Sequence, residues 1–214
     1  QPEVAALVNF GRTRERLYME NSPSSMANIA WLAGALGLPD ARAVVDLAMG
    51  VPLGANGLRF LPFINGGGGI TAGFVGLKSH HTPADMARAV VDAVAALHAR
   101  HTARLASQGL PVSASSVLGG GASDARLVRL LAALLGHPVE RCADDETGAR
   151  GAALYAAMSQ DLDDAGPASP LRAPCELIEP DARDARAHAD FNAEFNELID
   201  RMSPVFNHLS GGAS

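Results

Sequence analysis

Two consecutive strand–turn–helix units in the second half of the sequence limit the folds that are open to this chain. The strands are predicted over Val112–Leu118 and Val139–Cys142, and the helices over Asp124–Leu135 and Thr147–Met158. Gly136 and Pro138 separate the two units, because glycine ends helices and proline cannot continue them. Strands that alternate with helices are typical of layered α/β domains, in which helices cover a sheet.

The first half of the sequence predicts three more helices and several short strands. Strand-like segments are expected over Val4–Phe10, Arg16–Glu20 and Leu58–Phe63, and helices over 23–36, 40–49 and 83–108, with Gly73–Leu77 leading into the last of these. Ser22 is the expected N-cap of the first helix, with Pro23 in its first position. Thr82, Pro83 and Asp85 form a capping-box pattern at the start of the long helix. The first helix and the long helix thus have recognisable start signals.

The C-terminal third is predicted to end in one more helix. Residues 161–180 are polar and contain proline, and we expect a connection without regular structure there. Over about 183–207, Phe191, Phe195, Leu198 and Met202 recur at helical spacing and indicate a buried side. A single domain is therefore expected over residues 1–209, with a flexible tail over 210–214.

Composition excludes several classes of function. The chain has 214 residues, a formal net charge of −6 and 48% hydrophobic residues, and no segment concentrates Lys and Arg. A nucleic-acid surface normally shows a basic patch, so we expect no nucleic-acid partner. No apolar run approaches the roughly 20 residues that span a bilayer. Cys142 and Cys175 lie far apart and form no CxxC pair, which predicts neither a disulfide framework nor a zinc site and favours a reducing, cytoplasmic setting.

The turn Gly119–Ala122 lies between a predicted strand and a predicted helix. Glycines allow a sharp turn and the close approach of a flat ligand, and the following helix start suits phosphate or ribose oxygens. A tight turn without a ligand explains the same residues equally well. The segment matches neither a P-loop nor the dinucleotide-binding fingerprint.

Four other segments have both a structural and a functional interpretation. The small residues of Glu146–Ala153 favour close packing of a helix, which could support a nucleotide pocket from behind. The hydroxyls of Ser22–Ser25 either cap a helix or face phosphates or ribose. His98 and His101 have a spacing that could share a metal, but no acidic third ligand is near them in sequence. Asp144–Glu146 either caps a helix or holds Mg²⁺.

Taken in order, the motifs resemble the C-terminal domain of the FGGY family of carbohydrate kinases, which includes xylulokinases, glycerol kinases and ribulokinases. The resemblance rests on Ala72–Leu77 with Asp85–Met86 and Ala89–Asp92, on Leu118–Ser123, and on His137–Val139 with Glu146–Ala153. Ala30–Leu32 and Phe60–Phe63 also occur in the expected order. It covers nearly the whole chain, and Glu20–Ser25 leans toward xylulokinase-like members.

The resemblance implies a ribonuclease H-like lobe of the actin/Hsp70/hexokinase type, with a mixed sheet flanked by helices. It implies that ATP, with Mg²⁺, binds between two lobes. The residues that it places near ATP are Gly120, Gly121, Ala122, Ala125, Met26 and Ala30. Gly120, Gly121 and Ala122 would border the adenosine, and Met26 and Ala30 would approach the nucleotide. At Ala125, relatives often have a polar side chain that this chain lacks.

The resemblance also implies that a carbohydrate kinase needs parts that this sequence does not contain. The family's N-terminal lobe, with its catalytic Asp and most of the sugar site, and its phosphate-binding turn would lie before Gln1. The expected partners are ATP, a ketose or polyol and the missing lobe, and a homodimer is left open. The expected activity is transfer of the γ-phosphate to a sugar hydroxyl, by the parent protein but not by this piece alone. An actin-like nucleotide switch or pseudokinase, and a lone interaction domain, are the alternatives.

Overall fold

The computed structural model describes residues 6–9, 16–19, 22, 24–67, 69–142, 144, 146–160, 162 and 169–210. The helices are α1 (Ser25–Ala35), α2 (Ala41–Ala48), α3 (Pro83–Ser107), α4 (Ala125–Leu135), α5 (Thr147–Ser159) and α6 (Ala185–Ser210). The strands are β1 (Ala6–Asn9), β2 (Arg16–Met19), β3 (Arg59–Leu61), β4 (Gly73–Val75), β5 (Ser115–Leu118), β6 (Val139–Cys142) and β7 (Glu176–Ile178). Pro23, Asp145 and the predicted tail beyond Ser210 lie outside the described residues.

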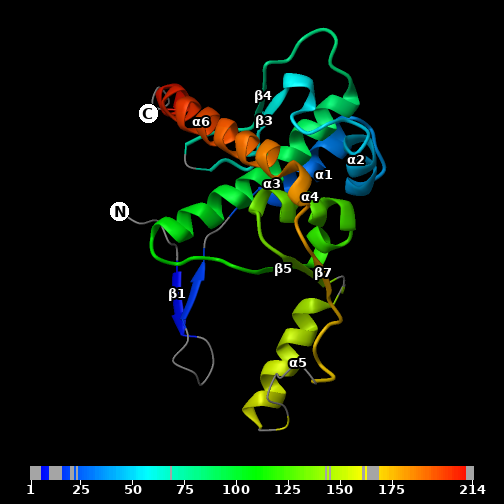
Figure 1. Ribbon diagram of the computed structural model, residues 1–214, viewed down its shortest axis with the longest axis vertical. Helices are drawn as coiled ribbons and strands as arrows, with labels where there is room; N and C mark the ends of the chain where they lie inside the picture. Colours follow the sequence, from blue (N-terminus) through cyan, green and yellow to red (C-terminus); the bar gives the residue numbers. More distant parts are fainter. Residues whose placement is uncertain are drawn as a thin grey trace.

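The described strands form three small sheets. Strands β1 and β2 pair antiparallel, as do β3 and β4. The third sheet has the order β5-β6-β7, in which β5 and β6 are parallel and β6 and β7 antiparallel. This mixed sheet with flanking helices confirms the predicted α/β class (Figure 1).

Helix α3 is the centre of the hydrophobic core. It contacts α1, α2, α4 and α6, and its residues from Ala87 to Leu97 are all buried. Phe191, Phe195 and Ile199 of α6 join the same core, so the predicted apolar side of the last helix packs inward. A smaller cluster around Val128 and Val139 lies between α4 and the mixed sheet. None of the described helices is both long and apolar enough to span a bilayer.

Two carboxylates of α3 hold the loop that joins α2 to β3. Asp92 accepts a hydrogen bond from the Gly54 N–H at 2.8 Å, and Asp85 accepts one from Asn56 Nδ2 at 2.7 Å. The loop needs this support, because Ala55 and Asn56 both adopt positive φ angles that side chains disfavour. Arg88 reinforces it, with its Nε 2.8 Å from Asp92 Oδ1 and its Nη1 donating to Val51 O.

The predicted capping box at Thr82 is confirmed. The Thr82 N–H and hydroxyl both donate to Asp85 Oδ2 at 2.7 Å, while Asp85 N–H donates back to Thr82 Oγ1. Hydrogen bonds from Thr82, and then from Asn56, lower the pKa of Asp85 to about 2. The charged carboxylate therefore holds the start of α3.

Removal of this cap should weaken the fold measurably. We expect Thr82→Ala to lower the free energy of unfolding by about 1 kcal/mol, the usual cost of losing an N-cap side chain. Because the pKa of Asp85 is lowered on folding, its contribution is present above pH 4 and is lost as the pH falls toward 2. Urea unfolding at pH 7 and pH 3 measures both effects. Thr71→Ala, at an exposed loop threonine, is the control, and equal losses in the two variants would contradict the role of the cap.

Helix α1 begins two residues later than the predicted start at Pro23. Ser24 precedes the helix but makes no side-chain capping bond. Its buried hydroxyl instead accepts the N–H of Asn65 at 3.1 Å, and so ties α1 to the loop after β3. Asn28 supports the same loop by donating to Pro62 O and accepting from the Ile64 N–H. Long-range contacts therefore override the local capping signal.

The expectation of an unstructured connection over 161–180 is wrong in part, because β7 lies within it. Strand β7 pairs with β6 and brings Cys175 to Cys142, and the two form a disulfide across 33 residues of sequence. The expectation that the cysteines stay unpaired is therefore also wrong. The separation in sequence gave no hint, since it is the strand pairing that brings the two cysteines together.

Helix α5 projects away from the body of the molecule (Figure 1). It has no buried residue, and its small residues Ala152, Ala153 and Ala156 are exposed. The predicted close packing of this helix is therefore not seen within the described residues.

Candidate functional site

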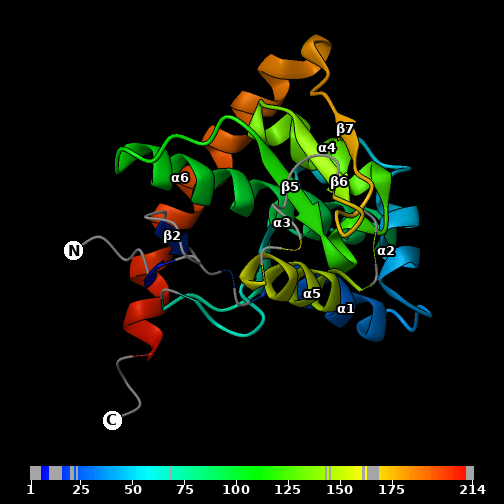
Figure 2. The same ribbon diagram turned by 90° about the horizontal axis from the view of Figure 1, so that it is seen from below.

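A cavity of about 380 Å³ opens beside β5, between α1, α3 and α4. Its volume lies in the usual range of small-molecule sites. Figure 2 shows β5 running between these helices when the molecule is viewed from below. The cavity is lined by Ser25, Met26, Val94, Ala95, His98, Thr102, Ser115, Ser116, Val117, Leu118, Gly121, Leu127, Val128, Leu131 and Leu135.

The glycine turn after β5 borders this cavity. Gly119 has a φ of +65°, which favours glycine, and residues 119–122 form a single 3-10 turn. The Ser123 hydroxyl closes the turn by donating to Gly120 O at 2.7 Å. A Cβ added at Gly121 would lie 3.4 Å from Val117 Cγ1, and both residues line the cavity. The absence of side chains on the turn thus leaves room beside β5.

The lining carries no acidic or basic side chain except a histidine. His98 is largely buried, and burial lowers its pKa, which favours the neutral ring. Its Nε2 lies 3.0 Å from Ser25 Oγ, and the remaining polar groups are hydroxyls. Such a cavity suits an uncharged, flat ligand with a few hydrogen-bonding groups, and offers nothing to neutralise phosphates.

The start of α4 also disfavours phosphate. Asp124 caps the helix by accepting the Arg126 N–H at 2.9 Å, and its carboxylate pairs with the Arg126 side chain. Arg126 pairs with Asp46 of α2 as well. Because a carboxylate already occupies the positive end of the helix dipole, a second anion there would be repelled. The helix start is therefore closed to the phosphate oxygens that the turn alone suggested.

The structure brings together only part of the predicted nucleotide-binding set. Gly121 and Met26 line the same cavity from opposite elements. Gly120 is exposed on the turn, and Ala125 is half-buried in the first turn of α4. Ala122 is fully buried and its carbonyl accepts from Arg141, so it shapes the turn by packing, and Ala30 is exposed on α1 outside the lining.

The residues of α3 and α4 that form the walls of the cavity were not predicted from the sequence. Val94, His98 and Thr102 recur every four residues on α3, and Leu127, Leu131 and Leu135 do so on α4. Residues four apart share one face of a helix, so this spacing was an available signal. It predicts a common face but not a cavity, since a packed core has the same pattern.

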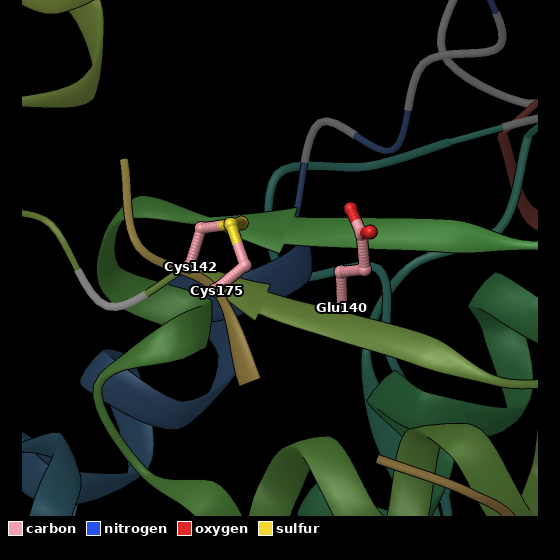
Figure 3. Close-up of side chains that lie close together, drawn as sticks. All are labelled: Glu140, Cys142 and Cys175. Atoms are coloured by element: carbon pink, nitrogen blue, oxygen red, sulfur yellow. A yellow bond between two sulfur atoms is a disulfide. The ribbon is translucent and has the colours of Figure 1, made fainter. Parts of the chain in front are cut away.

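The histidines of α3 do not form a metal site. The rings of His98 and His101 meet edge to face with centroids 6.3 Å apart, and His98 already bonds Ser25. Burial, followed by the charges nearby, lowers the pKa of His101 to about 4. Within the described residues, Glu140, Cys142 and Cys175 form the one group of three side chains of the kinds that bind metals (Figure 3). Its two sulfurs are joined in the disulfide and are not available as thiolates.

Asp144 of the acidic run has a structural role. Its carboxylate accepts the Glu146 N–H at 3.0 Å and pairs with Arg150 of α5, and these contacts lower its pKa. Asp144 thus supports the start of α5 from outside the helix, whereas Glu146, the N-cap residue, makes no side-chain capping bond, so the expected capping is not seen. The described part of the chain shows no oxygen-rich set that would hold Mg²⁺ by itself.

The model of the FGGY family of carbohydrate kinases, C-terminal domain, matches residues 12–160. This chain belongs to the FGGY family. The match includes the turn after β5, the cavity walls on α1, α3 and α4, and helix α5. The family assigned by resemblance is thus confirmed, and the cavity lies within its C-terminal domain.

Curated relatives of this FGGY chain are sugar kinases. It is 31% identical over 145 residues to L-xylulose/3-keto-L-gulonate kinase of Escherichia coli K12. The matched region covers 66% of this chain and 29% of that protein. It is 33% identical over 140 residues to glycerol kinase of Gloeobacter violaceus, covering 62% of the chain and 28% of that protein. The FGGY chain therefore spans about 30% of the length of these relatives.

Solved structures confirm the sugar-kinase fold of the FGGY chain. Xylulose kinase of Rhodospirillum rubrum superposes with a TM-score of 0.69 at 28% identity, covering 88% of this chain and 40% of that one. Ligand-bound xylulose kinase of Lactobacillus acidophilus gives a TM-score of 0.72 at 19% identity, with coverage of 86% and 39%. The expected actin/hexokinase-like lobe is confirmed by these neighbours.

Proposed function

We propose that this chain is the nucleotide-binding lobe of an ATP-dependent carbohydrate kinase. The whole protein would transfer the γ-phosphate of ATP to a hydroxyl of a ketose or polyol, with a xylulose-like sugar preferred. The family and the relatives named as xylulose and glycerol kinases support this proposal. They do not favour a nucleotide switch without kinase activity.

The observation that carries the proposal is the uncharged cavity beside the glycine turn. Its lining of apolar groups and hydroxyls suits adenine and ribose, and Gly121 leaves space where a side chain would intrude. Gly120, Ala122 and Ala125 would contribute backbone or packing contacts at its border, and Ala30 would approach the nucleotide from the exposed side of α1. The base and ribose would therefore bind this lobe, with the phosphates directed outward.

The chemistry of phosphoryl transfer would rest on residues outside this chain. Transfer needs a positioned sugar hydroxyl, a base and a metal ion that neutralises phosphate charge. Mg²⁺ would accompany ATP through its phosphate oxygens, since the described residues offer no site of their own. We further propose that the missing N-terminal lobe supplies the base and the sugar site, and that the isolated chain is inactive.

Competition binding tests which part of ATP this lobe recognises. We expect the 214-residue chain to bind a fluorescent ATP analogue, and adenosine to displace it with an affinity within about tenfold of that of ATP, a difference of about 1.4 kcal/mol. Inorganic tripolyphosphate should not compete, because the cavity has no cationic lining. Calorimetry with unlabelled ATP provides an independent affinity.

The opposite pattern would contradict the proposal. Displacement by tripolyphosphate but not by adenosine would identify a phosphate site elsewhere on the chain. ATP consumption with xylulose, ribulose and glycerol should stay at background for the chain alone. Sustained turnover would show that the chain contains its own catalytic base.

A further inference from the structure

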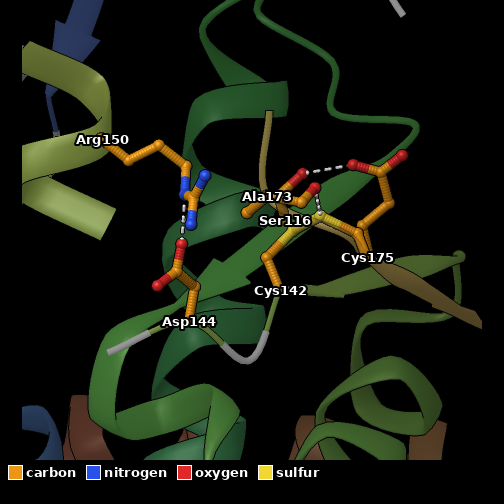
Figure 4. Close-up of a disulfide and its surroundings, with 7 residues drawn as sticks. Ser116, Cys142, Asp144, Arg150, Ala173 and Cys175 are labelled. Atoms are coloured by element: carbon orange, nitrogen blue, oxygen red, sulfur yellow. Dashed lines mark hydrogen bonds and ion pairs between the residues drawn. A yellow bond between two sulfur atoms is a disulfide. The ribbon is translucent and has the colours of Figure 1, made fainter. Parts of the chain in front are cut away.

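The disulfide extends the pairing between β6 and β7 by one position. Val139, Glu140 and Arg141 face Ile178, Leu177 and Glu176 in the antiparallel register. Cys142 and Cys175 are the next pair in this register, with Cα atoms 4.3 Å apart. Figure 4 shows the bond at the end of β6, where the chain also enters β7. The disulfide thus locks the open end of a three-residue strand pair.

The two cysteines differ in exposure. Cys142 is buried, with 4% of its surface exposed, whereas Cys175, the residue before β7, is exposed. Accessible disulfides are the ones that exchange most readily with external thiolates, and Cys175 is on the more exposed side of this bond. A groove of about 320 Å³ lined by both cysteines, Leu154 and Leu171 lies alongside. The bond is therefore open to reduction without unfolding of the core.

One arginine connects the disulfide to the glycine turn. Arg141 precedes Cys142, and its Nε donates to Ala122 O at 2.7 Å while its Nη2 donates to Ser123 O at 3.3 Å. Its Nη1 lies 3.3 Å from Glu176 Oε2, and Glu176 follows Cys175. Arg141 therefore joins the end of the turn to β7, one residue from each half-cystine.

The parallel neighbour gives a second connection. Leu118 of β5 is the register partner of Cys142, and the glycine turn begins at the following residue. The turn is thus held at its start by β5 and at its end by Arg141. Strand β7 pairs with β6 over only three residues, and the disulfide adds a covalent cross-link next to Glu176, which contacts Arg141.

We propose that Cys142–Cys175 is a redox-sensitive tether, whose reduction releases β7, frees Arg141 from Glu176 and loosens the Gly119–Ser123 turn. Since that turn borders the cavity assigned to adenosine, reduction weakens nucleotide binding. The second statement rests on the proposed function, and the first does not. Arg141 is a positioning residue in this scheme, because it acts on the turn and not on the ligand.

The reductant is a dithiol, small or protein-borne. One of its thiolates attacks Cys175 Sγ, which breaks the Cys142–Cys175 bond, forms a mixed disulfide and releases the Cys142 thiolate. The second thiolate of the dithiol then attacks the dithiol sulfur that is bonded to Cys175. This step closes the cyclic disulfide and releases the Cys175 thiolate. The dithiol loses two electrons and two protons to become a cyclic disulfide, and the protein gains two thiols.

Hydrogen exchange and nucleotide affinity of the 214-residue chain, with and without dithiothreitol, test the two statements separately. EDTA is present throughout, so that metal ions cannot bridge the reduced thiols. On reduction we expect faster amide exchange in residues 119–123 and 176–178, unchanged exchange in α3, and a Kd for the ATP analogue raised about fivefold or more. In Cys175→Ser, which alters only the exposed partner, both readouts should match the reduced protein and ignore dithiothreitol.

Arg141→Gln tests the route. This variant should have a mobile turn in both redox states, so that reduction no longer changes exchange at 119–123 although it still does so at 176–178. Equal exchange and equal affinity in the oxidised and reduced wild-type chain would overturn the proposal and leave the proposed function standing. Faster turn exchange on reduction, without ATP binding in either state, would keep the tether and reject the nucleotide site. An Arg141→Gln chain that keeps the full redox response at the turn would exclude Arg141 as the connection.

Discussion

Replacement of Gly121 by leucine should abolish most nucleotide binding while leaving the fold intact. A Cβ at this position would meet Val117 Cγ1 at 3.4 Å, an ordinary contact, so the backbone can accept a side chain. The remaining leucine atoms must then occupy space beside β5, where Gly121 and Val117 line the cavity. We expect the Kd for ATP to rise by roughly a hundredfold, or about 2.8 kcal/mol. Calorimetry measures the affinity, and circular dichroism checks the fold.

A matched glycine provides the control for this substitution. Gly50 follows α2, is exposed, and an added Cβ there would meet only Leu47 O at 3.5 Å. Gly50→Leu should bind ATP as the unaltered chain does. If Gly121→Leu bound ATP equally well, the cavity beside β5 would not be the nucleotide site.

Replacement of Arg88 by methionine should strongly destabilise the fold while leaving the candidate site untouched. Arg88 and Asp92 are both buried, with 8% and 1% of their surfaces exposed, and they form an ion pair within α3. Methionine keeps the packing of the arginine stem but leaves the Asp92 carboxylate without its cation. Loss of one partner of a buried pair costs about 3–5 kcal/mol. Urea unfolding at pH 8 measures this loss.

The loss of stability in Arg88→Met should become smaller as the pH falls. Burial raises the pKa of Asp92 to about 6, against the lowering effect of Arg88, and removal of Arg88 raises it further. Because the folded state then holds a proton that the unfolded state releases, stability increases as the pH falls from above the folded pKa toward 4. The deficit of Arg88→Met should thus shrink between pH 8 and pH 5. Arg88→Met with Asp92→Asn should recover much of the stability and lose this pH dependence, and an unchanged deficit at both pH values would contradict the uncompensated charge.

Local signals were sufficient for the elements whose ends are set by capping and by glycine. The long helix α3 starts at Pro83 and its cap Thr82, and α4 ends before Gly136, which has a φ of +71°. Strand β6 has the predicted bounds. In each case the residues that determine the boundary are neighbours in the sequence, so no knowledge of the fold was needed.

Long-range pairing defines what the sequence did not indicate. Strand β7 is three residues long and two of them are exposed, so it has no apolar alternation and exists only through its pairing with β6. The disulfide depends on the same pairing. The cavity likewise needs α1, α3 and α4 to converge on β5; the sequence marked Gly121 through its glycine turn, but Met26 came only from family resemblance. His98 and Ser25 were noted, but their meeting across 73 residues was not foreseeable.

The loop between α2 and β3 has consequences for how this region can vary in length. Gly54 and Asn56, two residues apart, are held by Asp92 and Asp85, which lie two helical turns apart on α3. Helix α3 fixes the distance between the carboxylates of Asp85 and Asp92. The chain from Gly54 to Asn56 must therefore have the length that lets both residues reach them. An inserted or deleted residue between Gly54 and Asn56 would remove one partner and leave a carboxylate of α3 unpaired. Surface loops usually tolerate changes in length. This loop should not tolerate them, because the rigid helix α3 fixes the distance between its two anchoring carboxylates.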